Sequence, residues 1–216
     1  MRIPGTITNG DTGDVADDFY HKYKEDIQNM IDLGFKTYRM SLSWPRILPD
    51  GIASNPNQAG VDFYMTIIDL CIAAGIEPLI TLYHWDLPAT LNDKTDHGGW
   101  LNPTIIDRFN EYADFCFKTY GHKVKRWITI NEPQSVSWLG YGQGIHAPGR
   151  CSPYMLSTCE ANGGGGDSTR EPYLVAHHLL LSHATAVKTY RDKYQKTQGG
   201  EIGLCINAGW AEPWDL

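Results

Sequence analysis

The chain alternates between short apolar runs and longer segments in which apolar residues recur with the spacing of a helix face. Four runs rich in apolar, β-branched and aromatic residues predict strands at residues 35–44, 76–85, 125–131 and 201–207. The second run is almost continuously apolar, which is typical of a strand buried on both faces of a parallel sheet. We therefore expect these four strands to lie in one sheet.

Helical patterns fill the intervals between and before the predicted strands. The four predicted helices cover residues 17–33, 61–74, 103–121 and 172–194. Gly34 and Gly75 follow the first two helices, as glycine commonly does at a helix C-terminus. Asn102 before Pro103 predicts an N-cap with proline in the first turn of the third helix.

This alternation of strands and helices implies an α/β fold with a parallel sheet and right-handed crossovers. Four such units make half of a closed (β/α)8 barrel, which typically needs ~250 residues. Because the chain has 216 residues and long loops, we expect residues 1–216 to form a single partial TIM-barrel domain. A doubly wound open sheet is the alternative, but no glycine fingerprint for a dinucleotide follows the first strand.

Polar and aromatic residues follow two of the predicted strands directly. Residues 127–133 read Trp-Ile-Thr-Ile-Asn-Glu-Pro, so the strand runs into Asn131 and Glu132 before a proline that cannot continue the ladder. Residues 83–88 read Tyr-His-Trp-Asp-Leu-Pro and repeat this design. Ligands of parallel α/β sheets and barrels bind at the carboxyl ends of strands. The pattern predicts proton transfer by Glu132 within a carbohydrate site.

Composition excludes several other functions. The net charge is −7 and no block of Lys and Arg stands out, which argues against a nucleic-acid or anionic-membrane partner. No stretch approaches the ~20 apolar residues of a membrane-spanning helix. The three histidines His177, His178 and His183 lack the His-Glu-x-x-His spacing of a zinc site, so we predict no metal. A serine hydrolase is disfavoured because the Gly-x-Ser-x-Gly elbow is missing.

Two of the five cysteines, Cys151 and Cys159, fall in a polar loop and are close enough to close a short ring. We favour a disulfide over two free thiols. A disulfide would indicate an oxidising compartment, either secretory and extracellular or vacuolar. Without it we expect a cytoplasmic protein. No apolar signal segment follows Met1, so either the mature protein is cytosolic or its true N-terminus is missing, and we favour the second.

Four motifs in this order resemble glycoside hydrolase family 1, the retaining β-glucosidases. Residues 38–47 read Tyr-Arg-Met-Ser-Leu-Ser-Trp-Pro-Arg-Ile and residues 146–150 read His-Ala-Pro-Gly-Arg. Between them lie Tyr-His-Trp-Asp-Leu-Pro at 83–88 and Thr-Ile-Asn-Glu-Pro at 129–133. The loop at 151–159 is most similar to plant-type members. The resemblance covers nearly the whole chain and implies hydrolysis of a β-glucoside or oligosaccharide without a cofactor.

The resemblance also implies a role for individual residues. Glu132 would be the general acid/base, and Asn131 would hydrogen-bond the sugar 2-hydroxyl. His84 and Trp85 would hold the sugar at the cleavage site. Arg39 would lie beside the nucleophilic carboxylate and keep it ionised, because an arginine buried in an apolar strand needs such a partner.

The chain also departs from the family pattern. The nucleophile belongs to a Thr-Glu-Asn-Gly type motif on a later strand, and the family's first strand with its sugar-binding Gln is absent as well. We expect the chain to hold strands two to five of eight, the N-terminal half of the catalytic barrel, and to be inactive alone. Asn207, on the fourth strand, would contact the leaving-group side. The alternatives are a non-catalytic relative that binds sugars or proteins, and an incomplete gene product. The oligomeric state stays open.

Overall fold

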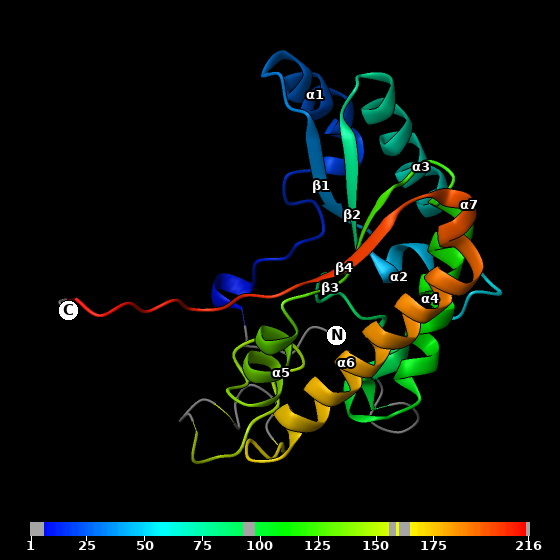
Figure 1. Ribbon diagram of the computed structural model, residues 1–216. Coiled ribbons are helices and arrows are strands. Elements are labelled where there is room, and N and C mark those ends of the chain that lie inside the picture. The colour runs from blue at the N-terminus through cyan, green and yellow to red at the C-terminus, as the bar shows by residue number, and fades with distance from the viewer. Residues whose placement is uncertain (1–6, 93–97, 156–158, 160–164, 215–216) are drawn as a thin grey trace.

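The computed structural model describes residues 7–92, 98–155, 159 and 165–214, and its centre is a four-stranded parallel sheet (Figure 1). The strands are β1 (Thr37–Ser41), β2 (Glu77–Tyr83), β3 (Arg126–Asn131) and β4 (Glu201–Cys205). They pair in the order β1-β2-β3-β4, so the order of strands never reverses in the described chain. A doubly wound sheet contains such a reversal. The sheet is therefore part of a barrel, as the sequence predicts.

The longest helices between successive strands lie on one side of the sheet (Figure 1). The α-helices are α1 (Phe19–Asp32), α2 (Trp44–Ile47), α3 (Gln58–Ala73), α4 (Ile105–Tyr120), α5 (Pro133–Tyr141), α6 (Glu171–Tyr190) and α7 (Lys196–Gln198). Short 3₁₀ turns cover Thr8–Gly10, Ala89–Asn92 and Gly99–Leu101, and a π-helical turn at Arg191–Gln195 continues α6.

The structure corrects several predicted boundaries. The first strand ends at Ser41, because Trp44 begins α2, with Pro45 in the first turn, where a helix tolerates proline. The third predicted helix begins at Ile105 and not at Pro103. The Asn102 side chain accepts a hydrogen bond from the Thr104 N–H at 3.0 Å, which forms a turn before α4.

The hydrophobic core lies between the sheet and the helices. Met40, Ile80 and Trp127 sit side by side on three neighbouring strands, and all three are buried. Phe117 of α4 packs its ring against Trp127 with centroids 5.1 Å apart. The Tyr112 hydroxyl of α4 donates to the Leu82 carbonyl at 2.9 Å. These contacts fix α4 against the strands whose ends carry the predicted site residues.

The opposite face of the sheet carries ion pairs at the amino ends of the strands. Arg126 of β3 bridges Glu77 of β2 and Glu201 of β4, with N–O distances of 2.9 Å to each. All three side chains are exposed, so each pair contributes only about 0–1 kcal/mol. Their arrangement supports the register of three strands at the end of the sheet opposite Glu132.

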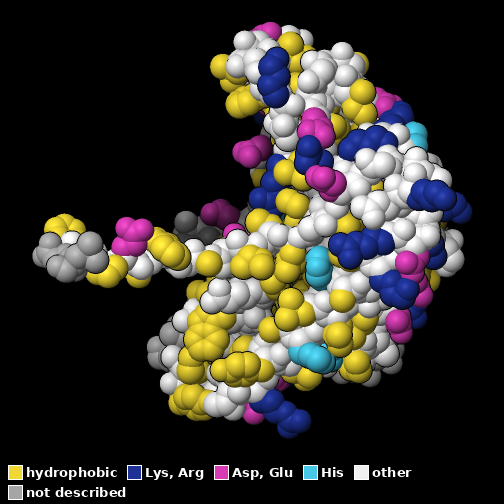
Figure 2. Space-filling model, in the orientation of Figure 1, with side chains coloured by type: hydrophobic (Ala, Val, Ile, Leu, Met, Phe, Trp, Pro, Cys, Tyr) yellow, Lys and Arg dark blue, Asp and Glu magenta, His cyan; other side chains and the backbone are white. Residues whose placement is uncertain are grey.

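The segment that follows β4 extends away from the sheet (Figure 1). It carries large apolar side chains, and Trp210 and Trp214 are 86% and 97% exposed. Hydrophobic side chains also gather on the lower half of the molecule in Figure 2. Exposed apolar surface of this kind is typical of regions that pack against other protein.

Gly60 allows α3 to pack directly on the backbone of α2. A Cβ atom at this position would lie 2.4 Å from the Arg46 carbonyl oxygen. Alanine normally stabilises a helix over glycine by up to about 1 kcal/mol. We expect Gly60→Ala to reverse this sign and lower the free energy of unfolding by about 1–3 kcal/mol, because backbone must move. Urea denaturation measures the change.

The neighbouring exposed residue Ala59 provides the control, since Ala59→Gly should cost about 1 kcal/mol or less. A Gly60→Ala variant as stable as the unchanged protein would contradict the close approach of α3 to Arg46.

Candidate active site

The side chain of Asn131 connects residues from three strand ends. Its Oδ1 accepts a hydrogen bond from Arg39 Nη2 of β1, and its Nδ2 lies 3.1 Å from Nε2 of His84, directly after β2. The main-chain oxygen of Asn131 accepts the indole N–H of Trp85 at 2.8 Å. Asn131 is only 2% exposed. The structure thus brings together Arg39 of β1, His84 and Trp85 after β2, and Asn131 of β3, and Glu132 follows Asn131 in the chain.

These bonds determine the protonation of His84. Because Asn131 Oδ1 accepts from Arg39, the Asn131 amide nitrogen donates to His84 Nε2. His84 is then a neutral imidazole with its proton on Nδ1. Burial lowers the pKa of His84, and the charge of Arg39 lowers it further, whereas Glu132 opposes both effects. The imidazole is therefore neutral at pH 7.

Trp85 and Glu132 both adopt left-handed backbone conformations, with φ of 80° and 46°. For non-glycine residues such conformations cost on the order of 1–3 kcal/mol and cluster at functional sites. The Trp85 ring is held between His84 and His146, with centroids 5.5 Å and 5.3 Å away. A hollow of about 390 Å³ borders Trp85, Val136 and His146.

Glu132 lies at the junction of β3 and α5. Its N–H donates to the Cys205 carbonyl at 2.8 Å, and its half-buried side chain accepts the Ser135 hydroxyl at Oε2, 2.9 Å away. Pro133 begins α5 and turns the chain out of the sheet. Sequence reasoning missed Ser135. A serine three residues after a carboxylate, across the first turn of a helix, is the signal that could have identified it.

Two predicted residues lie in different surroundings from those expected. Asn207 is not on β4 but two residues beyond it, exposed, and its Nδ2 donates to the Ser135 hydroxyl at 3.2 Å. Arg39 is exposed and not buried, because it projects from the face of β1 that the helices leave open. Its hydrogen bonds in the described chain go to Asn131 and to the Thr81 hydroxyl, 3.3 Å away, and not to a carboxylate.

Asp86, next to His84 and Trp85 in the chain, is half-buried, and its carboxyl oxygen Oδ1 is fully buried. Its Oδ1 has no hydrogen-bond partner among the described residues. Burial raises the pKa of Asp86 to about 6, although hydrogen bonds from Ser43 and from backbone N–H groups and the charge of Arg46 lower it. An ionised Asp86 therefore costs stability at neutral pH.

A cross-linked loop follows α5 and borders the site through His146. The structure joins Cys151 and Cys159 in a disulfide with Cα atoms 5.9 Å apart. Arg150 makes a two-bond contact with Glu171 of α6, with its Nε and Nη2 atoms 2.8 Å and 2.5 Å from the carboxylate oxygens. Such paired Arg–carboxylate bonds fix geometry well, so the loop is anchored to α6.

In the described part of the chain, no helix combines the length and apolarity that crossing a membrane requires. The same residues contain no group of three or more His, Cys, Asp or Glu side chains arranged to hold a metal ion.

Comparison with known proteins gives consistent matches. The sequence profile of glycosyl hydrolase family 1 matches residues 1–216. Rice (Oryza sativa subsp. japonica) β-glucosidase 26 is 53% identical over 211 residues, and Arabidopsis thaliana β-glucosidase 17 is 51% identical over 213 residues. Each match covers 98% of this chain but only 39% and 40% of the relative, so the chain spans about two fifths of their length.

A solved structure of a rice enzyme is also similar to this chain. A mutant of the rice β-glucosidase Os3BGlu6 in a covalent complex with Glc superimposes with a TM-score of 0.90 at 48% identity. The match covers 97% of this chain and 42% of that one.

The raised pKa of Asp86 predicts how stability depends on pH. The folded protein binds this proton more tightly than the unfolded chain, whose carboxyl titrates near 3.8. The stabilising contribution is therefore complete below pH 3.8 and is lost as pH rises through about 6. Asparagine does not titrate, so Asp86→Asn escapes this loss. When the pH rises from ~4 to ~7.5, we expect the unfolding free energy of Asp86→Asn to increase by about 2–3 kcal/mol relative to that of the unchanged protein.

Denaturant unfolding at the two pH values measures this gain. Asp26→Asn, at an exposed position of α1, is the matched control and should show a much smaller pH-dependent difference. An equal response of the two variants would show that Asp86 is not buried as described.

Proposed function

The chain belongs to glycosyl hydrolase family 1, and from this premise we propose that it forms the acid/base side of a retaining β-glucosidase active site. The main support for this proposal is the pair of contacts that the Asn131 side chain makes with Arg39 of β1 and with His84 after β2. Glu132 directly follows Asn131, so it lies at the same edge of the sheet. The substrate is a β-glucoside or a glucose-containing oligosaccharide. The rice and Arabidopsis relatives, which are β-glucosidases by name, support this choice.

Glu132 donates the proton that cleavage requires. In retaining enzymes a second carboxylate, about 5–5.5 Å away, attacks the anomeric carbon while the acid protonates the departing oxygen. The covalent complex of Glc with the rice enzyme supports such an intermediate in that protein. After it has given up its proton, Glu132 is a carboxylate, and it accepts a proton from the water that attacks the glycosyl-enzyme bond.

The second carboxylate is proposed to come from a strand outside residues 1–216, in a longer protein of the size of the relatives. Arg39 marks where it would lie. The guanidinium carries five N–H donors, and the bonds to Asn131 and Thr81 leave donors that can bind a carboxylate. Such bonds favour the ionised form, which is the nucleophile.

Asn131, His84 and Trp85 are proposed to bind the sugar. The Asn131 amide uses one N–H on His84, so its second N–H remains for the 2-hydroxyl. His84, neutral and with its proton on Nδ1, is available to bond a second hydroxyl. The indole of Trp85 provides an aromatic surface beside them. Asn207, connected to Glu132 through Ser135, is proposed to face the leaving group.

The Cys151–Cys159 disulfide supports an oxidising compartment. We propose a secreted, extracellular or vacuolar location, in preference to the cytoplasm.

The acid role of Glu132 predicts a dependence on the leaving group. In the full-length protein, Glu132→Gln should lower kcat/KM for an alkyl β-glucoside by about 10²–10⁴-fold. A glucoside with a very acidic phenol needs no proton, so its glycosylation step should change little. Glu25→Gln, on the exposed surface of α1, is the control and should behave like the unchanged enzyme. Equal losses on both substrates would contradict the role.

Residues 1–216 alone should not turn over an aryl β-glucoside, because cleavage needs the second carboxylate. The measurement is release of the phenol by the purified chain, with the full-length protein as positive control. Sustained turnover by the shorter chain would show that both carboxylates lie within it.

A further inference from the structure

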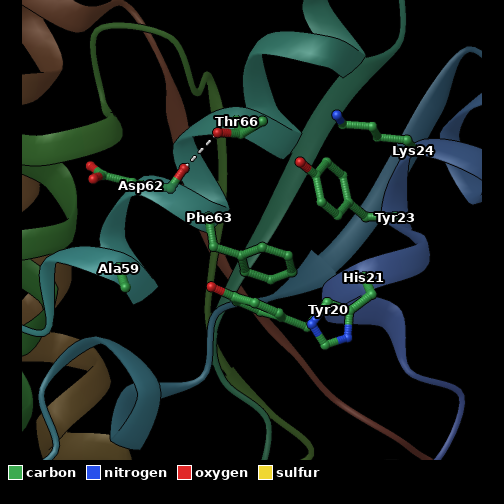
Figure 3. Close-up of a pocket in the computed structure, with 8 residues that line it drawn as sticks. All are labelled: Tyr20, His21, Tyr23, Lys24, Ala59, Asp62, Phe63 and Thr66. Carbon is green, nitrogen blue, oxygen red and sulfur yellow. Dashed lines mark hydrogen bonds between the residues drawn. The ribbon is translucent and has the colours of Figure 1, made fainter.

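A groove of about 480 Å³ lies between α1 and α3, and the proposed mechanism does not use it (Figure 3). Tyr20 and Tyr23 of α1 and Phe63 of α3 form its aromatic part. None of the residues that line the groove belongs to β2 or β3 or bonds to Asn131. A separate ligand can therefore occupy it.

The aromatic part of the groove is rigid. Phe63 is 6% exposed, and its ring lies 4.7 Å from that of Tyr20 at 31° and 5.5 Å from that of Tyr23 at 89°. The guanidinium of Arg46 lies 5.2 Å from the Phe63 ring and 5.8 Å from the Tyr20 ring, which adds cation–π attraction. Tyr20 nevertheless remains 44% exposed. Because these rings are already held in place, binding a ligand to them costs little side-chain entropy of the protein.

The rim of the groove is polar without a net charge. Lys24 and Asp62 contribute one charge of each sign, although the Asp62 carboxylate also accepts from Gln58 at 2.7 Å. The Thr66 hydroxyl donates to the Asp62 main-chain oxygen at 2.8 Å and so faces a ligand as an acceptor (Figure 3). His21 is engaged by Asp18 at 2.6 Å. A rim that holds one cation and one anion selects neither an anionic nor a cationic ligand. It suits a neutral molecule with many hydroxyl groups.

We propose that this groove is a second, non-catalytic saccharide site that binds one or two hexose units of an oligosaccharide. A hexose ring presents an apolar C–H face that packs on an aromatic ring, and its hydroxyls reach the rim. Ligand sites generally combine an apolar, aromatic surface with a few orienting polar groups. The open groove leaves the remainder of an oligosaccharide in solvent. The assignment does not depend on the role of Glu132.

The test is an NMR titration of the full-length protein with a thio-linked cellotriose, whose S-glycosidic bonds resist hydrolysis, followed separately at the two sites. Tyr20→Ala should weaken binding at the groove by about 10-fold or more, because it removes the exposed ring. Tyr20→Phe keeps the ring and should stay within about threefold. Both variants should retain the kcat/KM for an aryl glucoside. Tyr173→Ala, at a 77% exposed tyrosine of α6, is the matched control.

A protein that binds a single equivalent of the thio-linked cellotriose, abolished by His84→Ala, would overturn the proposal. So would groove binding that Tyr20→Ala leaves unchanged. Should Tyr20→Ala fail to fold, Lys24→Gln and Thr66→Val on the rim decide the question. Loss of affinity at the groove with normal hydrolysis supports the site, and unchanged affinity in both variants rejects it.

Discussion

The orientation of one buried amide, that of Asn131, determines the chemistry of the whole strand edge. Arg39 fixes which atom of the amide is the acceptor, and His84 receives the donor. As a result, the His84 imidazole is neutral and one N–H of the Asn131 amide remains for a ligand. The backbone position from which Glu132 projects is also fixed. The same residue holds the Trp85 indole through its main-chain oxygen. Residues of three neighbouring strands are thereby connected through one residue.

This arrangement is locally unfavourable and depends on the layer beneath it. Trp85 and Glu132 have strained backbones, and Asp86 buries a carboxyl oxygen that has no hydrogen-bond partner in the described part of the chain. The helix side of the sheet offsets these costs. The ring of Trp44 stacks on Tyr112, with ring centroids 4.8 Å apart and ring planes at 4°, and the Tyr112 hydroxyl bonds the Leu82 carbonyl of β2. A rigid core allows the strained residues to keep one geometry, which pre-organised catalysis requires.

The sequence predicted what depends on pattern and missed what depends on tertiary contacts. The prediction of four strands was confirmed because each strand coincides with an apolar run. The predicted proximity of Asn131 and His84 was also confirmed, because neighbouring parallel strands end at the same edge of the sheet. The helices α2 and α5 were missed, since four and nine residues give too few turns for a clear periodicity. The exposure of Arg39 and the link from Asn207 through Ser135 depend on three-dimensional packing that spacing does not encode.

The most direct test of Glu132 as acid/base is chemical rescue of Glu132→Ala in the full-length protein with azide. Without the base, a glycosyl-enzyme formed from an activated glucoside should accumulate, and azide can attack it in place of deprotonated water. The account predicts faster turnover and a β-configured glucosyl azide, because two inversions give retention. Turnover that azide does not change, or an α-configured product, would contradict the account.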